Sequence, residues 1–457
     1  MLEKVLECIE TSKKTYLEQV KDWIRIPSVS ADPNHKQDVI KSANFVADDL
    51  RSFGFDVELI THEGGNPLVY AEWMKAPGKP TALIYGHYDV QPVDPLNEWN
   101  TEPFEPVEKN GNLYARGTAD DKGQLFTHVK AVEAWLKTTG KLPINVKFII
   151  EGEEESGGDS LYKYVKVAKE KLKCDFCMIS DSSQFAPGQP AITYGLKGMA
   201  GIEFVLTGPS QDLHSGTFGG AITNPGNALC KIIAALHDEN RKITVPGFYD
   251  DVKDLDAWER ESFSKLGFSD KEFFESVGVS GGIGEKGYTP LERKWARPTC
   301  DINGITCGYQ GVGTKTIIPA KASAKVTFRL VPAQDPMKVL DALKKYITSL
   351  CPEGIKIEFI DEFGAGPALI NVESKYMSAA VEAITEGFGT KPVFIREGGS
   401  IPIVVSFQKY LGVDTLLLGW GQNDDNIHSP NEKFSIDAFY RGIKTSAAIL
   451  DRCSKLK

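Results

Sequence analysis

A histidine and an aspartate stand where a short apolar run of the sequence ends. Residues 82–90, ALIYGHYDV, have the composition of a β-strand that finishes near His87, and Asp89 follows two residues later. A strand end holds a side chain in place, so the imidazole can bind an ion while the carboxylate orients its ring. The segment therefore indicates a metal site. An ordinary hydrogen-bonded His and Asp pair is the alternative.

Three other segments place ligand-type side chains after apolar runs. Asp120 and Asp121 follow a strand-like run and precede an expected helix. Asp181 ends the segment CDFCMISD, and His428 lies in a polar loop after TLLLGW. Zinc-class ions accept carboxylate and imidazole ligands. A helix cap or a solvated turn explains each segment separately, but their recurrence favours one shared site.

The densest acidic cluster follows residues 146–150, an apolar run broken by Lys147. It contains Glu151 and then three consecutive glutamates, Glu153, Glu154 and Glu155. Like charges this close repel one another, although solvent screens them on an exposed loop. The Ser-Gly-Gly that follows is typical of a turn that approaches another group closely. A bound cation accounts for the cluster.

The order of these motifs along nearly the whole chain resembles the M20 family of di-metal peptidases, most closely its dipeptidase branch. The motifs are GHxD at 86–89, RGxxDDKG at 116–123, EESG at 154–157, DLHSG at 212–216, REGGSIP at 396–402 and HSxNE at 428–432. Three glutamates in a row also allow the EE pair to be placed one residue earlier, but the Ser-Gly that follows favours Glu154 and Glu155.

The resemblance implies two divalent metal ions per subunit, zinc or manganese. The implied ligands are His87 and Asp181 for one ion, Glu155 and His428 for the other, and Asp120 for both. Asp89 is implied to hold the His87 ring through its second nitrogen. Glu154 is implied as the general base, which takes a proton from the attacking water and returns it to the leaving amine.

The resemblance also implies residues that bind substrate. His214 matches a family residue that polarises the substrate carbonyl in the neighbouring active site of a homodimer. The residues implied in gripping the terminal carboxylate of the substrate are Arg329, Thr316, Gly399 and Ser400. An exposed strand arginine is the alternative for Arg329. Our own hypothesis is that Glu397 meets the free amino group of a dipeptide.

Composition narrows the class of protein and its partners. The chain has 457 residues, 41% hydrophobic and 25% charged, which is typical of a large globular enzyme. A net charge of -10 without a basic stripe argues against nucleic acid as a partner. No apolar run approaches the ~18 residues of a membrane span. Eight cysteines predict a reduced, cytoplasmic setting, with Cys174 and Cys177 as packing residues.

Alternating strand and helix patterns predict the elements that position these residues. Strand-like runs lie at 55–60, 68–73, 81–86, 144–150 and 175–180, and return at 391–395 and 414–420. With helical stretches between them, they predict an α/β sheet. Between these groups, strands are expected at 202–208, 325–332 and 355–363, with helices at 224–236 and 336–350.

The second group predicts an inserted α+β, ferredoxin-like lid and dimerisation domain. The expected catalytic domain is therefore discontinuous, covering residues 1–197 and 367–457, and the insert covers residues 198–366. Residues 238–300 are treated as an elaboration of the lid, because their glycine-rich loop lacks the ending of a phosphate-binding loop.

The leading prediction is a metal-dependent dipeptidase that hydrolyses small dipeptides without a covalent intermediate. An N-acyl amino acid deacylase with the same di-metal core is the alternative, and it differs in needing no free substrate amine. A third possibility is a catalytically silent, metal-binding scaffold. That class predicts a non-acidic residue at the position of Glu154, where the acid is present.

Overall fold

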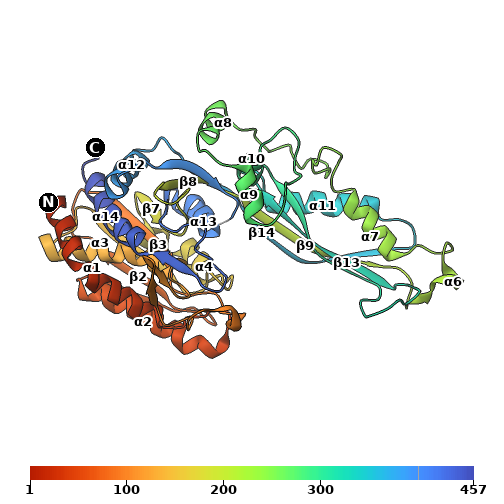
Figure 1. Ribbon diagram of the computed structural model, residues 1–457, viewed down its shortest axis with the longest axis horizontal. Coiled ribbons are helices and arrows are strands. Elements are labelled where there is room, and N and C mark those ends of the chain that lie inside the picture. The colour runs from red at the N-terminus through yellow and green to blue at the C-terminus, as the bar shows by residue number, and fades with distance from the viewer. Residues whose placement is uncertain (400, 457) are drawn as a thin grey trace. The chain divides into compact units, whose positions relative to one another are not determined.

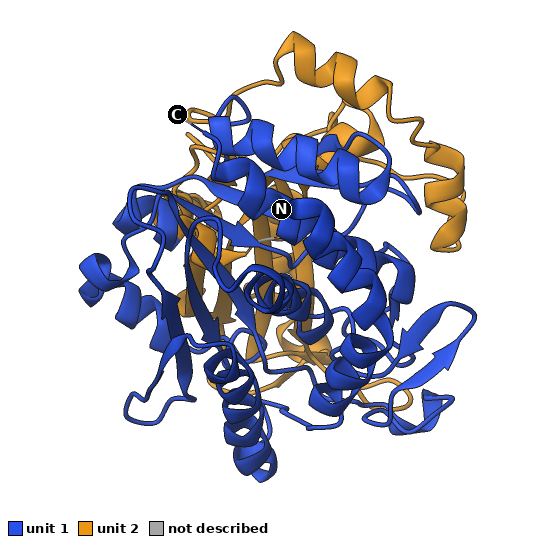
Figure 2. Cartoon of the chain, turned by 90° about the vertical axis from the view of Figure 1, so that its left-hand side faces the viewer, with its two compact units in different colours: residues 1–194, 370–395, 406–457 blue, residues 195–369, 396–405 orange. Residues whose placement is uncertain are grey.

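The computed structural model describes residues 1–399 and 401–456. Figure 2 shows two compact units: unit 1 comprises residues 1–194, 370–395 and 406–457, and unit 2 comprises residues 195–369 and 396–405. The expected boundaries at residues 197 and 367 lie near these divisions. The sequence places residues 396–405 in the catalytic domain, whereas in the structure they group with unit 2, where Arg396 forms an ion pair with Glu259.

The main sheet of unit 1, some of whose strands are labelled in Figure 1, has nine strands, one of which lies in unit 2. Their order is β1 (Asp56–Ile60), β2 (Leu68–Trp73), β6 (Asn145–Glu151), β3 (Thr81–His87), β7 (Phe176–Ile179), β17 (Thr415–Gly419), β8 (Ala191–Leu196) and β15 (Ala368–Leu369), and β16 (Val393–Glu397) also pairs with β8. The neighbours β6, β3, β7 and β17 are parallel. Their carboxyl ends therefore lie along one edge.

Helices pack on both faces of this sheet. The helices of unit 1, including α13, which begins in unit 2, are α1 (Leu2–Ile24), α2 (Lys36–Ser52), α3 (Lys122–Thr139), α4 (Ser160–Val167), α5 (Lys169–Leu172), α12 (Lys375–Phe388), α13 (Pro402–Leu411) and α14 (Ile436–Cys453). Successive residues of a strand point to opposite faces. On β3, the Tyr85 ring contacts Phe407 of α13, whereas Gly86 faces Leu125 of α3. The result is a three-layer α/β unit.

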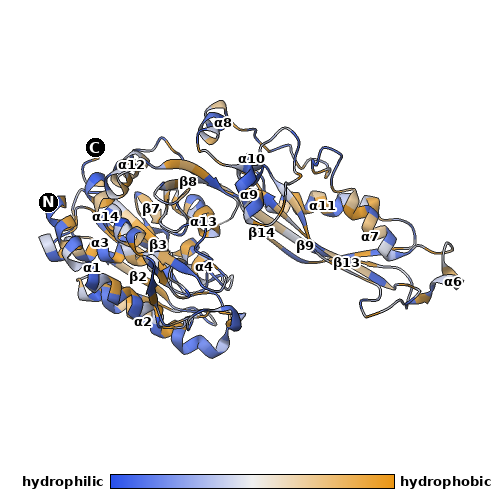
Figure 3. Ribbon diagram, viewed as in Figure 1, coloured by the Kyte–Doolittle hydropathy of each residue, from blue (hydrophilic) through white to orange (hydrophobic). Residues whose placement is uncertain are grey.

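The short elements of unit 1 are η1 (Pro33–His35), η2 (Leu96–Glu98) and a three-stranded sheet of β18 (Lys433–Ser435), β5 (Asn112–Tyr114) and β4 (Val107–Lys109). Figure 3 shows hydrophobic and hydrophilic stripes alternating along the long helices, as expected of helices with one buried face. Within the described part of the chain, every helix falls short of the length or apolar character that crossing a bilayer requires.

Helix α3 is buried along most of its length and contacts both α1 and α14. It buries polar side chains as well as apolar ones. His128 is 1% exposed, with its Nε2 atom 2.8 Å from Ser180 Oγ and its Nδ1 atom 3.0 Å from Ser446 Oγ. Because the ring is removed from water, burial lowers the pKa of His128 to about 3.

We expect His128 to make the stability of the protein depend on pH. Between its ordinary pKa of 6.5 and about 3, the unfolded chain binds a proton at this residue and the folded chain does not. The free energy of unfolding therefore decreases as pH falls through this window, by up to about 1.4 kcal/mol per pH unit. At pH 5, unfolding of His128→Gln should take up about one proton fewer than unfolding of the wild-type protein. Proton uptake on unfolding in denaturant can be measured potentiometrically. Equal proton uptake by the two proteins would contradict this assignment.

Unit 2 contains a four-stranded antiparallel sheet in the order β11 (Thr299–Cys307), β13 (Lys321–Leu330), β9 (Gly198–Thr207) and β14 (Lys356–Ala365). Helices α7 (Pro225–Ala234) and α11 (Pro336–Leu350) pack on it around one apolar core. The chain order β9, α7, β11, β13, α11, β14 is the β-α-β-β-α-β arrangement of ferredoxin-like folds. Sequence patterning misses β11.

The other elements of unit 2 are short. They are β10 (Leu213–His214), α6 (Ser215–Phe218), α8 (Ala257–Ser264), α9 (Asp270–Ser276), α10 (Pro290–Ala296) and β12 (Ile317–Ile318). Three of them, α8, α9 and α10, lie in residues 238–300, the segment without a clear sequence pattern. Capping boxes start α8 at Asp256 and α10 at Thr289. The role of this segment as a lid stays a prediction.

Candidate metal centre

The expected metal ligands gather at the carboxyl ends of the parallel strands. His87 is the last residue of β3, and Asp181 lies two residues beyond β7. Glu155 follows β6, and His428 lies in the loop after β17. Asp120 lies just before α3. Open α/β sheets bind ligands at this edge, so the topology brings together residues that are distant in sequence.

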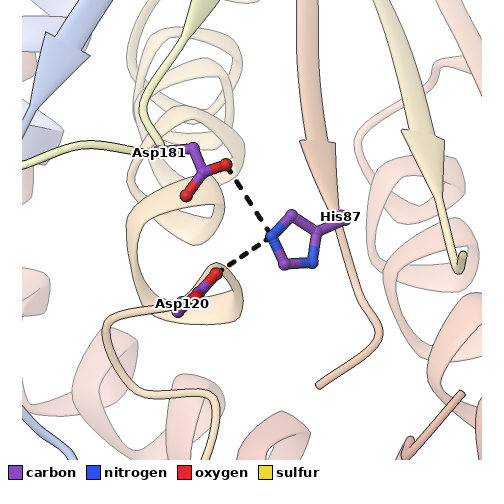
Figure 4. Close-up of side chains that lie close together, drawn as sticks. All are labelled: His87, Asp120 and Asp181. Atoms are coloured by element: carbon purple, nitrogen blue, oxygen red, sulfur yellow. Dashed lines mark ion pairs between the residues drawn. The ribbon is translucent and has the colours of Figure 1, made fainter. Parts of the chain in front are cut away.

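One cluster contains His87, Asp120 and Asp181 (Figure 4). The His87 Nε2 atom lies 3.1 Å from Asp120 Oδ1 and 3.9 Å from Asp181 Oδ2. Figure 4 shows both carboxylates pointing toward this nitrogen. His87 is fully buried, as expected of a residue at the end of a central strand.

The second cluster contains Asp120, Glu155 and His428. The His428 Nε2 atom lies 2.9 Å from Asp120 Oδ2 and 3.2 Å from Glu155 Oε2. Asp120 therefore belongs to both clusters and presents a different oxygen to each. This arrangement would allow one carboxylate to bridge two ions.

The donor atoms fit zinc-class ions. Within each cluster they lie within 4.8 Å of one another. Two ligand atoms that each lie about 2.0–2.1 Å from a tetrahedral ion are about 3.3–3.4 Å apart, close to the separations from His87 to Asp120 and from His428 to Glu155. The buried Nε2 atom of His87 has no hydrogen-bond partner among the described residues. A cation at this position gives that nitrogen a partner.

Asp89 is held firmly beside His87. Its Oδ2 atom accepts hydrogen bonds from Ser30 Oγ at 2.6 Å and from the backbone N–H of Glu155 at 3.1 Å. The His87 Nδ1 atom lies 3.1 Å from the backbone carbonyl oxygen of Asp89 and 3.5 Å from its Oδ1 atom. The nearer acceptor for the ring is therefore the backbone carbonyl of Asp89, and the role expected for Asp89 in holding the ring stays a prediction.

The three consecutive glutamates have different surroundings. Glu153 accepts hydrogen bonds from the backbone N–H groups of Asn66 at 2.6 Å and Ser160 at 3.2 Å, so it ties two loops together. Glu155 lies in the second cluster and also accepts a hydrogen bond from Gln91 Nε2 at 2.8 Å. This division supports the EE register at Glu154 and Glu155.

Crowded acids and burial shift the proton affinities of the site. Burial is the main cause that raises the pKa of Glu154 to about 7, and the Glu155 and Asp120 carboxylates add to the shift while His87 opposes it. Burial, followed by repulsion from Asp120, holds the pKa of Asp181 well above its usual range. Cations relieve such repulsion, so the electrostatics agree with the donor geometry.

The expected substrate-binding residues of unit 2 lie on several of its elements. His214 is the last residue of β10 and is exposed, and its Nδ1 atom accepts a hydrogen bond from the backbone N–H of Gly216 at 3.1 Å. The adjacent Ser215 N–H donates to the carbonyl oxygen of Thr316 at 3.1 Å. His214 and Thr316 are therefore neighbours. Arg329 lies on β13, opposite Thr299 of β11.

The structure describes all residues of the REGGSIP segment, 396–402, except Ser400. Glu397 is the last residue of β16, and its carbonyl oxygen accepts a hydrogen bond from the Lys197 N–H at 3.3 Å. Burial raises the pKa of Glu397, and the Lys294 ammonium group offsets part of that shift. Gly399 lies in a bend, and an added Cβ atom there would meet nothing within 4 Å. Ser400 falls outside the described residues.

Sequence reasoning missed residues that hold the loops of the site. Glu432 occurs in the HSxNE motif, but the sequence suggested no role for it. Its fully buried carboxylate contacts the loop that carries Asp120. Gln124 of α3 contacts both that loop and the start of the His428 loop. The only available signal was the presence of Glu432 within a motif.

Comparison with known proteins gives consistent matches. The model of the family described as Peptidase family M20/M25/M40 matches residues 83–452. The Cys-Gly metallodipeptidase DUG1 of Candida albicans is 35% identical over 472 residues, covering 98% of this chain and 96% of that protein.

Solved structures match over almost the whole chain as well. Human carnosine dipeptidase 1 has a TM-score of 0.84 and 32% identity, covering 100% of this chain and 99% of that chain. The M20 family metallo-carboxypeptidase Sso-CP2 from Sulfolobus solfataricus has a TM-score of 0.85 and 35% identity, covering 96% of this chain and 99% of that chain. These matches bear out the α/β fold class.

Proposed function

Because this chain belongs to peptidase family M20, and is therefore a hydrolase, we propose that it is a metal-dependent dipeptidase that cleaves small dipeptides. One observation carries the proposal: Asp120 presents separate oxygens to two clusters, each completed by a histidine and another carboxylate. Relatives named for dipeptide cleavage support the choice of substrate.

Two divalent ions, zinc or manganese, would be held by these clusters. The proposed ligands are His87, Asp120 and Asp181 for one ion, and Asp120, Glu155 and His428 for the other. When bound, such ions polarise a carbonyl oxygen and lower the pKa of water toward neutrality. Asp89 and its backbone carbonyl fix the orientation of the His87 ring, so that Nε2 faces the ion site.

Glu154 is our proposed general base. It lies between Glu153, which is tied to backbone N–H groups, and Glu155 of the second cluster. Its carboxylate takes a proton from the attacking water and later donates it to the leaving amine. A carboxyl group whose pKa lies near neutrality can both accept and donate a proton at neutral pH. No covalent intermediate is needed.

Recognition of a dipeptide requires groups for both of its charged ends. We assign the substrate carboxylate to the Arg329 guanidinium group, with Thr316, Gly399 and Ser400, because a planar guanidinium group pairs well with a carboxylate. We assign the free amino group to Glu397. An N-acyl amino acid lacks that ammonium group, so Glu397 would distinguish a dipeptidase from a deacylase.

We further propose that the protein acts as a homodimer in the cytoplasm. His214 would polarise the substrate carbonyl in the active site of the partner subunit, a role that suits an exposed imidazole outside unit 1. All eight cysteines are free thiols, which supports a reducing compartment. Cys177 is buried with its sulfur atom 3.9 Å from that of Cys174, in line with the packing role expected from sequence.

The experiment that tests this function measures amino acid release by metal-stripped protein supplied with zinc or manganese. The substrates are dipeptides with free termini, the same dipeptides acetylated at the amino end, N-acetyl amino acids and longer peptides. Metal-dependent cleavage confined to free dipeptides is the expected result. Preference for N-acetyl amino acids would identify a deacylase, and stepwise cleavage of longer peptides a carboxypeptidase. No turnover with either ion would identify a silent scaffold.

A further inference from the structure

The two clusters differ in how their ligands are supported. His87 ends β3 and Asp181 follows β7 closely, so the central sheet fixes both positions. His428 instead lies in a loop between β17 and β18, has a left-handed backbone with φ of 60°, and has a side chain that is 54% exposed. Asp120 lies in a second loop, between β5 and α3. The second cluster therefore depends on the relative position of two loops.

Glu432 joins these two loops. It lies on the His428 loop, and its carboxylate is fully buried against the Asp120 loop. The Oε1 atom accepts hydrogen bonds from the backbone N–H groups of Ala119 at 2.9 Å and Asp120 at 3.2 Å. The Oε2 atom accepts from the Gly117 N–H at 2.9 Å and from Arg116 Nη1 at 2.8 Å. Four donors from one loop thus converge on one side chain of the other.

Gln124 joins the same loops at the other end. Its Oε1 atom accepts hydrogen bonds from the backbone N–H groups of Trp420 at 2.9 Å and Gly421 at 3.2 Å, where the His428 loop begins. Its Nε2 atom donates to the carbonyl oxygen of Ala119 at 2.8 Å. The His428 loop is therefore attached to the Asp120 loop both before and after His428.

We infer that Glu432, assisted by Gln124 and Arg116, positions Asp120 relative to His428 and so sets the affinity of the second cluster for its ion. This inference rests on the ligands assigned under the proposed function. Glu432 is a positioning residue, since its contacts are with backbone groups and Arg116. Residues that orient metal ligands commonly change metal affinity about 10- to 100-fold when they are replaced.

The substitution Glu432→Gln tests the inference with almost no change of shape. An amide has one acceptor oxygen and brings N–H groups against two of the four donors, so the loops lose their fixed spacing. We expect the dissociation constant of the ion in the second cluster to rise about 10- to 100-fold and that of the ion in the first cluster to change little. Titration of metal-stripped protein with zinc, followed by elemental analysis after dialysis, should show one retained ion per chain instead of two.

Glu133→Gln is the matched control. Glu133 is another fully buried carboxylate of unit 1, and it pairs with Lys130 at 2.7 Å. Its replacement should lower the melting temperature of the metal-free protein and leave both ions bound. Arg116→Lys is a milder second variant, which keeps the charge but loses the hydrogen bond from Arg116 Nη2 to the Pro92 carbonyl oxygen. Arg116→Lys should also weaken binding of the second ion more than that of the first, but to a smaller degree. This variant tests the inference if Glu432→Gln does not fold.

The outcomes separate the inference from the proposed function. Two ions in the wild-type protein and unchanged binding in both loop variants would overturn the inference alone. Equal weakening of both ions, or the same loss in Glu133→Gln, would overturn it as well, because Glu432 would then act only on overall stability. Fewer than two ions in the wild-type protein would overturn the proposed function and, with it, the inference.

Discussion

Replacing Glu154 by Gln should lower kcat for a free dipeptide by about 10²- to 10⁴-fold, the range typical of general acid–base catalysis. The amide fills nearly the same space but cannot accept the proton of the attacking water. Glu154 belongs to neither metal cluster, so both ions should stay bound. The measurement is steady-state kcat on the zinc-loaded and manganese-loaded proteins, together with the metal content of each.

The neighbouring acid provides a control for the Glu154 variant. Glu153→Gln removes the same charge one residue earlier, from a side chain that holds the backbone N–H groups of Asn66 and Ser160. We expect it to reduce stability more than kcat. If kcat in Glu154→Gln stays within tenfold of the wild-type value, or if Glu153→Gln has the larger effect on kcat, the base has been assigned to the wrong residue.

Replacing Asp120 by Ala should remove both ions and abolish measurable turnover. Asp120 supplies Oδ1 to the cluster of His87 and Oδ2 to the cluster of His428, so one substitution removes a ligand from each. Its loss also leaves one fewer negative charge to balance two divalent cations. Elemental analysis after dialysis should find close to no bound metal, and activity should not return at metal concentrations that saturate the wild-type protein.

The matched variant for Asp120 is His428→Ala, which removes a ligand from the second cluster only. It should keep one ion per chain, held by His87, Asp120 and Asp181. A result in which Asp120→Ala and His428→Ala lose the same single ion would show that Asp120 does not bridge. Retention of both ions by Asp120→Ala would remove it from the ligand set.

Local sequence patterns predicted the central sheet well, because the buried strands are continuous apolar runs. The run at 81–86 corresponds to β3 (Thr81–His87), and the run at 144–150 corresponds to β6 (Asn145–Glu151). Such runs end where the chain leaves the core, so polar residues placed there identify the ligand-binding edge. The candidate metal ligands could be found for this reason, although they come from distant parts of the sequence.

The strand β11 could not be predicted from its own residues. It contains Asp301, Asn303 and Gly304, which are poor strand formers, and its pairing with β13 shifts register between Ile302 and Gly304. The long neighbouring strand β13 supplies the hydrogen bonds that hold it. Pairing with β13 therefore determines that these residues form a strand. A short stretch of sequence does not reveal such pairing.

The roles of Glu432 and Gln124 were hidden for a related reason. The structural role of a buried carboxylate or amide depends on its hydrogen-bond partners. Those of Glu432 lie more than 300 residues away in the chain. The ring of His87 provides a smaller example, since its nearer acceptor is a backbone carbonyl group, which no side-chain pattern reports. Sequence predicted candidate ion-binding residues, but not what holds them in position.

The discontinuity of unit 1 has a consequence for synthesis of the protein on the ribosome. His87, Asp120 and Asp181 all leave the ribosome before any of unit 2, whereas His428 follows all of it. Domains generally fold as units during synthesis, starting from the amino end. The nascent chain therefore contains every proposed ligand of the first ion before unit 2 is made. The proposed ligands of the second ion are complete only when the last segment of unit 1 has been made. With these proposed ligands, we expect metal capture by the growing chain to be sequential, with unit 2 made in between.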